Sequence, residues 1–311
     1  MANLFLPGYP EARTSIVLFR QKRSLLKLVG KDVMDFLHRM STNDLLDLPD
    51  GGNRRTVLVN EKGRIVDLVN IVRSGDSVRL IGSRGNGPGL AQWLERFIIM
   101  EDVRIAECQD TGEALSLIGP GSLSAVSERE RLSATAIAIR EDLGTIPAFL
   151  LLGEANLTGL PTMGDPAFET IRVEEGVPAY GRELTPEYNP LEAGLKDCIS
   201  FSKGCYIGQE VIARLNTYKK LQKILSVFEF PWHSGTSLSP GKLLHQGVDA
   251  GTVTSTVYSP AHQVWIGLGY RRLKTDTGNL VLQPGNGGGD VTARCVSELP
   301  ESYESYEITA E

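Results

Sequence analysis

The most informative stretch of this chain is Lys203-Gly204-Cys205-Tyr206-Ile207-Gly208-Gln209-Glu210. It places a cysteine between two glycines, with a lysine two positions before the thiol and a Gln-Glu pair after it. The residues that follow predict a helix, because Ile207, Val211 and Leu215 recur at i, i+4 and i+8. We therefore expect Cys205 at or just before a helix N-terminus, where unpaired backbone N–H groups favour negative charge.

Two interpretations of Cys205 follow. A thiol beside a helix N-terminus and near Lys203 is expected to hold more thiolate and to be reactive, with Gln209 on the same face. The alternative is a small packing residue, which is the commoner role of a single cysteine. The flanking glycines favour reactivity, because they let a ligand approach the sulfur closely. Cys108 and Cys295 lie in strand-like runs and are expected to be shielded.

Composition bounds the class of protein. A chain of 311 residues with 41% hydrophobic and 23% charged residues suggests a globular protein of two or three units. The net charge of −6 argues against a nucleic-acid-binding surface. No apolar run approaches the roughly 18–20 residues of a membrane span, and the N-terminus lacks the features of a signal peptide. We therefore expect a cytoplasmic protein. The four cysteines and four histidines show no ligand spacing, so no protein-held metal is expected.

The hydrophobic pattern divides the chain into two regions. Up to about residue 221, helices and strands alternate, as in an α+β fold. Helices are predicted over 32–40, 122–132 and 165–174, and a β-hairpin over 57–72. After residue 221, short β runs separated by Gly, Pro and Ser predict a small antiparallel barrel. We assign residues 1–222 to an α+β region of two interleaved subdomains and residues 223–311 to a C-terminal β-barrel domain.

The block at 203–210 resembles the signature of the YgfZ-type folate-binding proteins, relatives of the glycine-cleavage T-protein (aminomethyltransferase). The resemblance runs in order through nearly the whole chain, in the segments 41–44, 60–63, 171–176, 181–184, 189–195, 251–255 and 258–260. It implies a three-part, clover-like α+β fold around a central folate cavity, capped by a C-terminal antiparallel β-barrel. The implied cofactor is tetrahydrofolate or a one-carbon-substituted folate.

The resemblance also implies ligand-binding residues. Glu174, in the Arg-x-Glu-x-Gly motif, takes the position that hydrogen-bonds the pterin ring, and a carboxylate is able to accept two donors there. We assign four further residues to the cofactor, namely Asn43, Asp67, Tyr206 and Arg214.

Two departures from the T-protein pattern concern catalysis. The T-protein has consecutive aspartates where this chain has Asp67 followed by Leu68, and it has an aspartate at the position of Cys205. One acid is thus missing, and a soft nucleophile replaces another. These departures argue against aminomethyl transfer but not against folate binding.

The implied function is that of a tetrahydrofolate-binding accessory protein. Such a protein supports iron–sulfur cluster assembly or repair, and iron–sulfur-dependent enzymes such as those that thiolate tRNA, also under oxidative stress. Cys205, Lys203 and Gln209 would form its active group, and its partners would be folate and iron–sulfur client or assembly proteins, with the chain itself a monomer. Two alternatives stay open. One is a folate-dependent aminomethyltransferase or methyltransferase of the T-protein type, and the other is a binding module in which Cys205 is structural.

Overall fold

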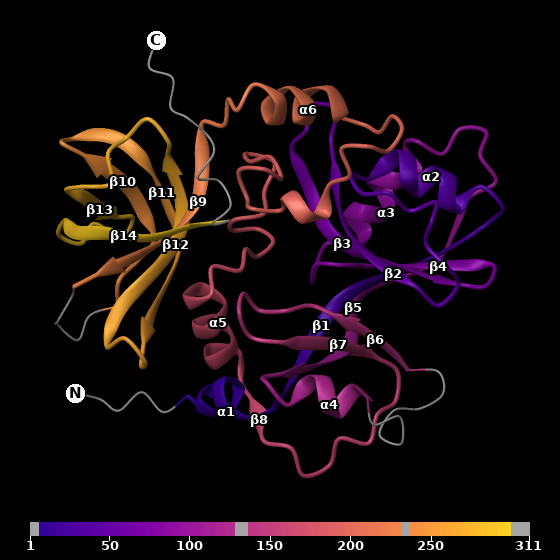
Figure 1. Cartoon of the computed structure of the whole chain (residues 1–311), viewed down its shortest axis with the longest axis horizontal. Helices are drawn as coiled ribbons and strands as arrows, with labels where there is room; N and C mark the ends of the chain where they lie inside the picture. The colour runs from indigo at the N-terminus through magenta and orange to yellow at the C-terminus, as the bar shows by residue number, and fades with distance from the viewer. Residues whose placement is uncertain (1–5, 128–135, 232–236, 300–311) are drawn as a thin grey trace.

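The computed structural model describes residues 6–127, 136–231 and 237–299. Figure 1 shows three groups of elements around a common centre. One group contains α2 and α3, the second contains α1, α4 and α5, and the third is a β-barrel. The predicted α+β clover with a C-terminal antiparallel barrel is therefore confirmed. Among the described residues, no helix is long and apolar enough to cross a membrane.

A large mixed sheet joins the first two groups. Its strand order is β2-β3-β4-β1-β5-β7-β6, and β8 pairs with β1 in parallel. The strands are β1 Val17–Val29, β2 Asn53–Val59, β3 Ile65–Ser74, β4 Ser77–Gly82, β5 Arg104–Ile118, β6 Ile137–Arg140, β7 Ala148–Leu152 and β8 Thr162–Met163.

Strands β1 and β5 are neighbours in the middle of this sheet and pair antiparallel from Val17↔Ile118 to Val29↔Arg104. The hydrophobic pattern predicts strands only over 25–29 of β1 and over 103–106 and 115–118 at the two ends of β5, because polar residues lie at 20–23 and 107–113. The strands continue through these polar stretches. In β1 the polar residues 20–23 face a cavity rather than the core.

Within the described residues, six α-helices flank the sheet or precede the barrel: α1 Tyr9–Thr14, α2 Val33–Met40, α3 Gly87–Glu95, α4 Ser122–Ser127, α5 Asp165–Glu174 and α6 Gln209–Thr217. A 3-10 turn, η2, spans Lys196–Cys198. Helix α2 buries Val33, Phe36, Leu37 and Met40, as its apolar spacing predicts. Helix α4 covers the start of the predicted range 122–132, and residues 128–132 lie outside the described residues.

The C-terminal region is a closed barrel of the order β10-β11-β12-β9-β14-β13, in which every pairing is antiparallel. Its strands are β9 Lys223–Phe230, β10 Gly241–His245, β11 Val248–Ser259, β12 Val264–Arg272, β13 Leu280–Pro284 and β14 Val291–Leu299. The first strand begins at Lys223, where the sequence placed the boundary. Strand β10 was not predicted, because Leu243 is the single fully buried side chain along it.

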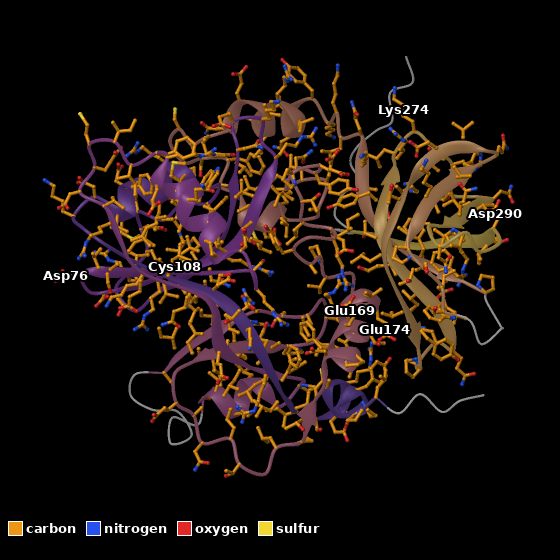
Figure 2. All side chains as sticks on the ribbon, turned by 180° about the vertical axis from the view of Figure 1, so that it is seen from behind. Asp76, Cys108, Glu169, Glu174, Lys274 and Asp290 are labelled. Atoms are coloured by element: carbon orange, nitrogen blue, oxygen red, sulfur yellow. The ribbon has the colours of Figure 1, made fainter. Side chains whose placement is uncertain are left out.

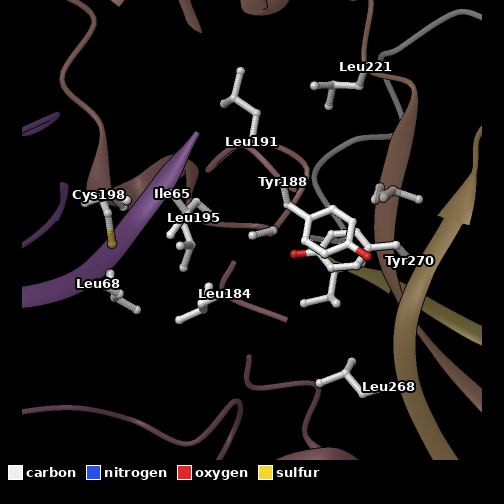
Figure 3. Packing of buried hydrophobic residues seen from close by; sticks show 14 of the residues in the cluster. Ile65, Leu68, Leu184, Tyr188, Leu191, Leu195, Cys198, Leu221, Leu268 and Tyr270 are labelled. Carbon is white, nitrogen blue, oxygen red and sulfur yellow. The ribbon is translucent and has the colours of Figure 1, made fainter. Parts of the chain in front are cut away.

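The barrel packs against the loop that follows α5. The rings of Tyr188 and Tyr270 stack with centroids 3.5 Å apart inside the largest hydrophobic cluster (Figure 3). Tyr270 Oη donates to the Glu183 carbonyl oxygen at 2.7 Å. The buried Glu183 carboxylate also accepts from Ser255 Oγ of β11 at 2.7 Å and from Arg172 Nη1 of α5 at 3.0 Å. Aromatic stacking and the hydrogen bonds of Tyr270 and Ser255 to Glu183 therefore join the barrel to the rest of the chain.

Candidate functional site

A cavity of about 850 Å³ lies between the large sheet and α5. This volume falls within the roughly 300–1,000 Å³ of small-molecule sites. The lining comes from residues 19–23 of β1, Arg55 of β2, Leu68 of β3, residues 116 and 118 of β5, Ala148 of β7, residues between 165 and 172 of α5, and the loops at 83–84, 141–143 and 177–184. No lining residue comes from the barrel, so the expectation that the barrel caps the cavity is wrong for the described residues.

The charge of the cavity lining is positive. Seven basic and four acidic side chains contribute to it. Four of the basic ones have no ion pair within the described part of the chain, and we call them the cavity cations: Arg20, Lys22, Arg55 and Arg84. Unpaired guanidinium and ammonium groups in a concave site attract carboxylates or phosphates. The cavity is therefore suited to an anionic ligand.

Two stacked aromatic rings form part of the same lining. Phe19 of β1 and Phe168 of α5 lie with centroids 4.3 Å apart and ring planes 11° apart. Tyr180 lines the cavity as well, and burial, followed by the charge of Asp67, raises the pKa of its hydroxyl. Aromatic side chains give a flat ligand an apolar contact surface. The lining thus combines an aromatic part with a cationic part.

A partly buried ion pair lies in the cavity wall. Arg23 Nη1 and Nη2 donate to the two Glu141 oxygens at 3.0 and 3.1 Å, and Arg23 Nε donates to the Gly82 carbonyl oxygen at 2.9 Å. Asn70 Nδ2 also donates to Glu141 Oε1. Burial opposes the ionisation of Glu141, but Arg23, Arg55 and Asn70 together outweigh it and lower the pKa of the carboxyl. Glu141 is therefore a carboxylate held inside a cationic wall.

Asp67 lies behind the wall rather than in it. Its carboxylate accepts from Ser83 Oγ at 2.6 Å, Ser83 N at 3.0 Å and Asn86 Nδ2 at 3.1 Å. Burial raises the pKa of this carboxyl, although these hydrogen bonds oppose the shift. Because side chains alternate along a strand, the next residue, Leu68, faces the cavity. The acid that survives in this pair therefore points away from the cavity.

Glu174 also lies outside the cavity lining. Both of its oxygens accept from Tyr9 Oη at 2.8 Å, and Arg13 Nη2 donates to Oε2. Its side chain is 2% exposed. Glu169, one and a half turns earlier on α5, is the glutamate of this helix that lines the cavity, and both are labelled in Figure 2. The assignment of Glu174 to the pterin stays a prediction, and it requires the contacts with Tyr9 and Arg13 to open.

The block at 203–210 is placed differently from what its pattern predicted. Helix α6 begins at Gln209, with Gly208 as its N-cap at φ 76°. Cys205 therefore precedes the cap by three residues, which places it before the helix N-terminus and not in the first turn. The reason lies in Gly208, whose left-handed conformation ends the loop and starts the helix later than the apolar spacing indicated. Cys205 is exposed and lies outside the cavity lining.

Lys203 acts as a clamp that joins the block at 203–210 to the C-terminal end of α2 and the loop after it. Its Nζ donates to the carbonyl oxygens of His38, Ser41 and Asn43 at 2.5, 2.9 and 2.7 Å. Burial lowers the pKa of this ammonium to about 8. All three N–H donors are used at the C-terminal end of α2 and the loop after it. Lys203 thus holds the loop 41–44 in place, and its predicted effect on Cys205 stays a prediction.

The remaining predicted residues are also dispersed. Asn43 Nδ2 donates to the Arg55 carbonyl oxygen at 3.0 Å, and Gln209 Nε2 donates to the Gly204 carbonyl oxygen at 3.4 Å. Tyr206 is buried in the hydrophobic cluster under the barrel, where burial raises its pKa to about 12. Arg214 lines a separate surface pocket of about 370 Å³. None of the three predicted active residues and none of the five predicted cofactor residues belongs to the described lining of the central cavity.

Two of the other cysteines and the metal expectation are also placed. Cys108 is exposed, so the expectation that its strand shields it is wrong. Burial, then the charges of Asp110 and Glu95, raises the pKa of this thiol. Cys198 is buried, and burial raises its pKa. Within the described ranges, no group of three or more His, Cys, Asp or Glu residues is arranged to hold a metal ion.

The residues that line the cavity were not identified from the sequence. Arg20, Lys22 and Arg23 form a charged run in β1, ahead of the predicted strand 25–29, and Glu141 stands in a connecting turn. The usable signal was this run of charge inside an otherwise apolar strand. Such a run marks a strand that faces a polar space instead of the core.

The comparisons with known proteins agree with this architecture. The family profile described as the GCVT N-terminal domain matches residues 13–141. A chloroplastic protein of Arabidopsis thaliana, which its name places among the transferases, is 28% identical over 303 residues, covering 88% of this chain and 68% of the relative. An aminomethyltransferase of Bacillus licheniformis is 25% identical over 276 residues, covering 78% and 75%.

A solved structure shows the same fold. The crystal structure of the glycine cleavage system aminomethyltransferase T from Bartonella henselae superposes with a TM-score of 0.78 at 18% identity. The superposition covers 93% of this chain and 87% of that chain. The profile thus matches the N-terminal part of this chain, the aminomethyltransferase relatives are similar to most of it, and the solved structure has the same fold.

Proposed function

We propose that this chain binds a reduced folate in the central cavity. The observation that carries the proposal is the pairing of stacked Phe19 and Phe168 with four unpaired cations in one lining. A folate has the matching chemistry, because its flat pterin and aminobenzoyl rings are joined to a glutamate with two carboxylates. Aromatic contacts suit the rings, and the cavity cations suit the carboxylates. The aminomethyltransferase relatives add a family context for tetrahydrofolate or a one-carbon-substituted folate as the ligand.

We propose an accessory role rather than aminomethyl transfer. The cavity side of the Asp67-Leu68 pair is a leucine, so an acid is missing where the T-protein pattern has one. The accessory role is support of iron–sulfur cluster assembly or repair, as in the YgfZ-type proteins that the 203–210 block resembles. Cys205 is exposed and therefore available to a protein partner. In this proposal the folate and the thiol act at two separate surfaces.

An aminomethyltransferase or methyltransferase activity is the second candidate. The relatives named as aminomethyltransferases favour it. Glu141 and Glu169 also place carboxylates in the cavity lining, although cationic side chains engage both. This candidate requires one of them to take over the part of the missing acid. It predicts turnover of an aminomethylated donor with tetrahydrofolate.

The test is calorimetric titration of the full chain with tetrahydrofolate under reducing, oxygen-free conditions. We expect saturable binding of one folate per chain. Glu174→Ala is titrated in parallel to test its assignment to the pterin, which predicts that loss of a hydrogen bond to this carboxylate weakens binding by about 1.5–3 kcal/mol. Equal affinity in the variant would remove Glu174 from the site. Absence of heat and of thermal stabilisation with wild-type protein would refute folate binding itself.

A further inference from the structure

The ion pair between Arg23 and Glu141 has unused hydrogen-bonding capacity. A guanidinium carries five N–H donors, and Arg23 uses three, on Gly82 and on the two oxygens of Glu141. One N–H on Nη1 and one on Nη2 remain. Among the described residues, Oε1 of Glu141 accepts from both Arg23 and Asn70, whereas Oε2 accepts from Arg23 Nη1 alone. A free donor on Nη1 therefore lies 3.0 Å from a free acceptor on Oε2.

The surroundings fix this pair in one charge state and one orientation. Asn70 is 1% exposed and holds Oε1 through its amide N–H. Its Oδ1 is buried without a hydrogen-bond partner among the described residues. An orphaned buried acceptor is rare, and it calls for an explanation such as a missing ligand or water. Arg55, paired in register with Asn70 on the neighbouring strand, adds a second positive charge that keeps Glu141 ionised.

A donor and an acceptor on adjacent atoms match a lactam, in which a ring N–H stands next to a carbonyl group. The pterin ring of a folate has such an edge, formed by its N3–H and its C4 carbonyl. We propose that Glu141 Oε2 accepts the pterin N3–H while Arg23 Nη1 donates to the C4 carbonyl oxygen. This proposal rests on the proposed function, because it names the part of the cavity that reads the folate ring. In it, Asn70 is a positioning residue that holds Glu141.

This arrangement needs no existing contact to break. The free donor and acceptor of the pair belong to two residues of the cavity lining. Glu174, in contrast, already accepts from Tyr9 and Arg13 and lies outside the lining. The geometry therefore favours Glu141 over Glu174 as the carboxylate that contacts the ring.

The experiment compares two ligands that differ at this edge alone. Folic acid carries the 4-oxo lactam, and aminopterin carries a 4-amino group, which turns the acceptor into a donor and the ring N–H into an acceptor. Titration of the full chain with each ligand gives an affinity ratio. We expect wild-type protein to prefer folic acid by about tenfold to a hundredfold, the usual effect of mispairing hydrogen bonds to charged groups. In Glu141→Gln the ratio should fall toward one, because an amide is able to present either its oxygen or its NH₂.

Two matched variants complete the design. Glu229→Gln makes the same change in an arginine-paired glutamate of the barrel and should keep the wild-type ratio. Glu174→Gln tests the competing assignment, because the ratio is kept if Glu141 contacts this edge of the ring and lost if Glu174 does. The wild-type ratio needs no substitution, so it is informative even if Glu141→Gln folds poorly.

The outcomes separate this inference from the proposed function. If wild-type protein binds neither tetrahydrofolate nor folic acid, the proposed function fails and the inference with it. If it binds folates but does not prefer folic acid over aminopterin, the inference alone fails. A ratio that survives in Glu141→Gln, or one that is lost in Glu174→Gln, also overturns the inference.

Discussion

The block at 203–210 and the wall of the central cavity differ in how their polar groups are used. In the block, Lys203 donates its three N–H groups to backbone carbonyl oxygens, and Tyr206 is buried in a hydrophobic cluster. In the cavity wall, Arg20, Lys22 and Arg84 have no ion pair to any described residue. The block is contiguous in sequence, whereas the wall collects residues from many segments. The block at 203–210 is thus in part a structural clamp, and charged residues dispersed along the sequence line the proposed site.

The largest expected effect is on stability, from removal of the clamp. Lys203→Met should lower the free energy of unfolding by about 2–4 kcal/mol, because three buried carbonyls lose their donor and each costs about 1–3 kcal/mol when left unpaired, less what water recovers. Urea unfolding monitored by circular dichroism measures the change. Folate affinity of the folded variant should stay near that of wild type.

Lys62→Met is the matched control, since Lys62 is exposed in the hairpin turn and should change stability little. A Lys203→Met protein that is as stable as Lys62→Met but no longer binds folate would reverse the comparison. It would move Lys203 from the clamp into the binding site.

The second effect is on binding, from the cavity cations. The double variant Arg20→Gln/Lys22→Gln should weaken tetrahydrofolate binding by about tenfold, since each exposed ion pair contributes about 0.2–1 kcal/mol. The loss should shrink at high salt, because salt screens exposed charges. Calorimetry at two salt concentrations measures it. Unfolding should be unchanged, since neither side chain makes an ion pair in the described structure.

The variant Lys31→Gln/Lys62→Gln removes the same charge from exposed positions outside the cavity lining. If this control weakens folate binding as much as Arg20→Gln/Lys22→Gln, the effect belongs to net charge and not to the cavity.

The smallest biophysical effect is expected at Cys205. Cys205→Ser should leave both the unfolding free energy and folate affinity within error of wild type, because the side chain is exposed and lies outside the cavity lining. It should impair the proposed cellular role, measured as iron–sulfur enzyme activity in a deletion strain complemented with the variant. Cys108→Ser, at another exposed thiol, serves as the control. Full complementation by Cys205→Ser would leave Cys205 a structural residue.

The sequence predicted the fold better than the site. The apolar spacing of α2, the hairpin of β2 and β3 and the start of the barrel at Lys223 follow from local patterns. Local patterns could not show that Glu174 turns toward Tyr9 and Arg13, because these partners lie more than 160 residues away. They also missed the pairing of Arg23 with Glu141, which depends on how β1 is placed beside the turn after β6. Motif position predicts chemistry poorly where neighbours in space are remote along the chain.

Arg172 makes one wall of the cavity depend on the position of the barrel. This residue lines the cavity, yet its five N–H donors are engaged by Glu169, Val177, Glu183 and Ser255. Ser255 belongs to the barrel and lies 83 residues farther along the chain. On this side of the proposed binding site, the wall residue Arg172 is therefore held in part by a barrel residue, even though no described barrel side chain lines the cavity. A shift of the barrel that moves Ser255 changes the shape of the proposed binding site. Ligand binding in the cavity is therefore thermodynamically linked to the packing of the barrel against the rest of the chain.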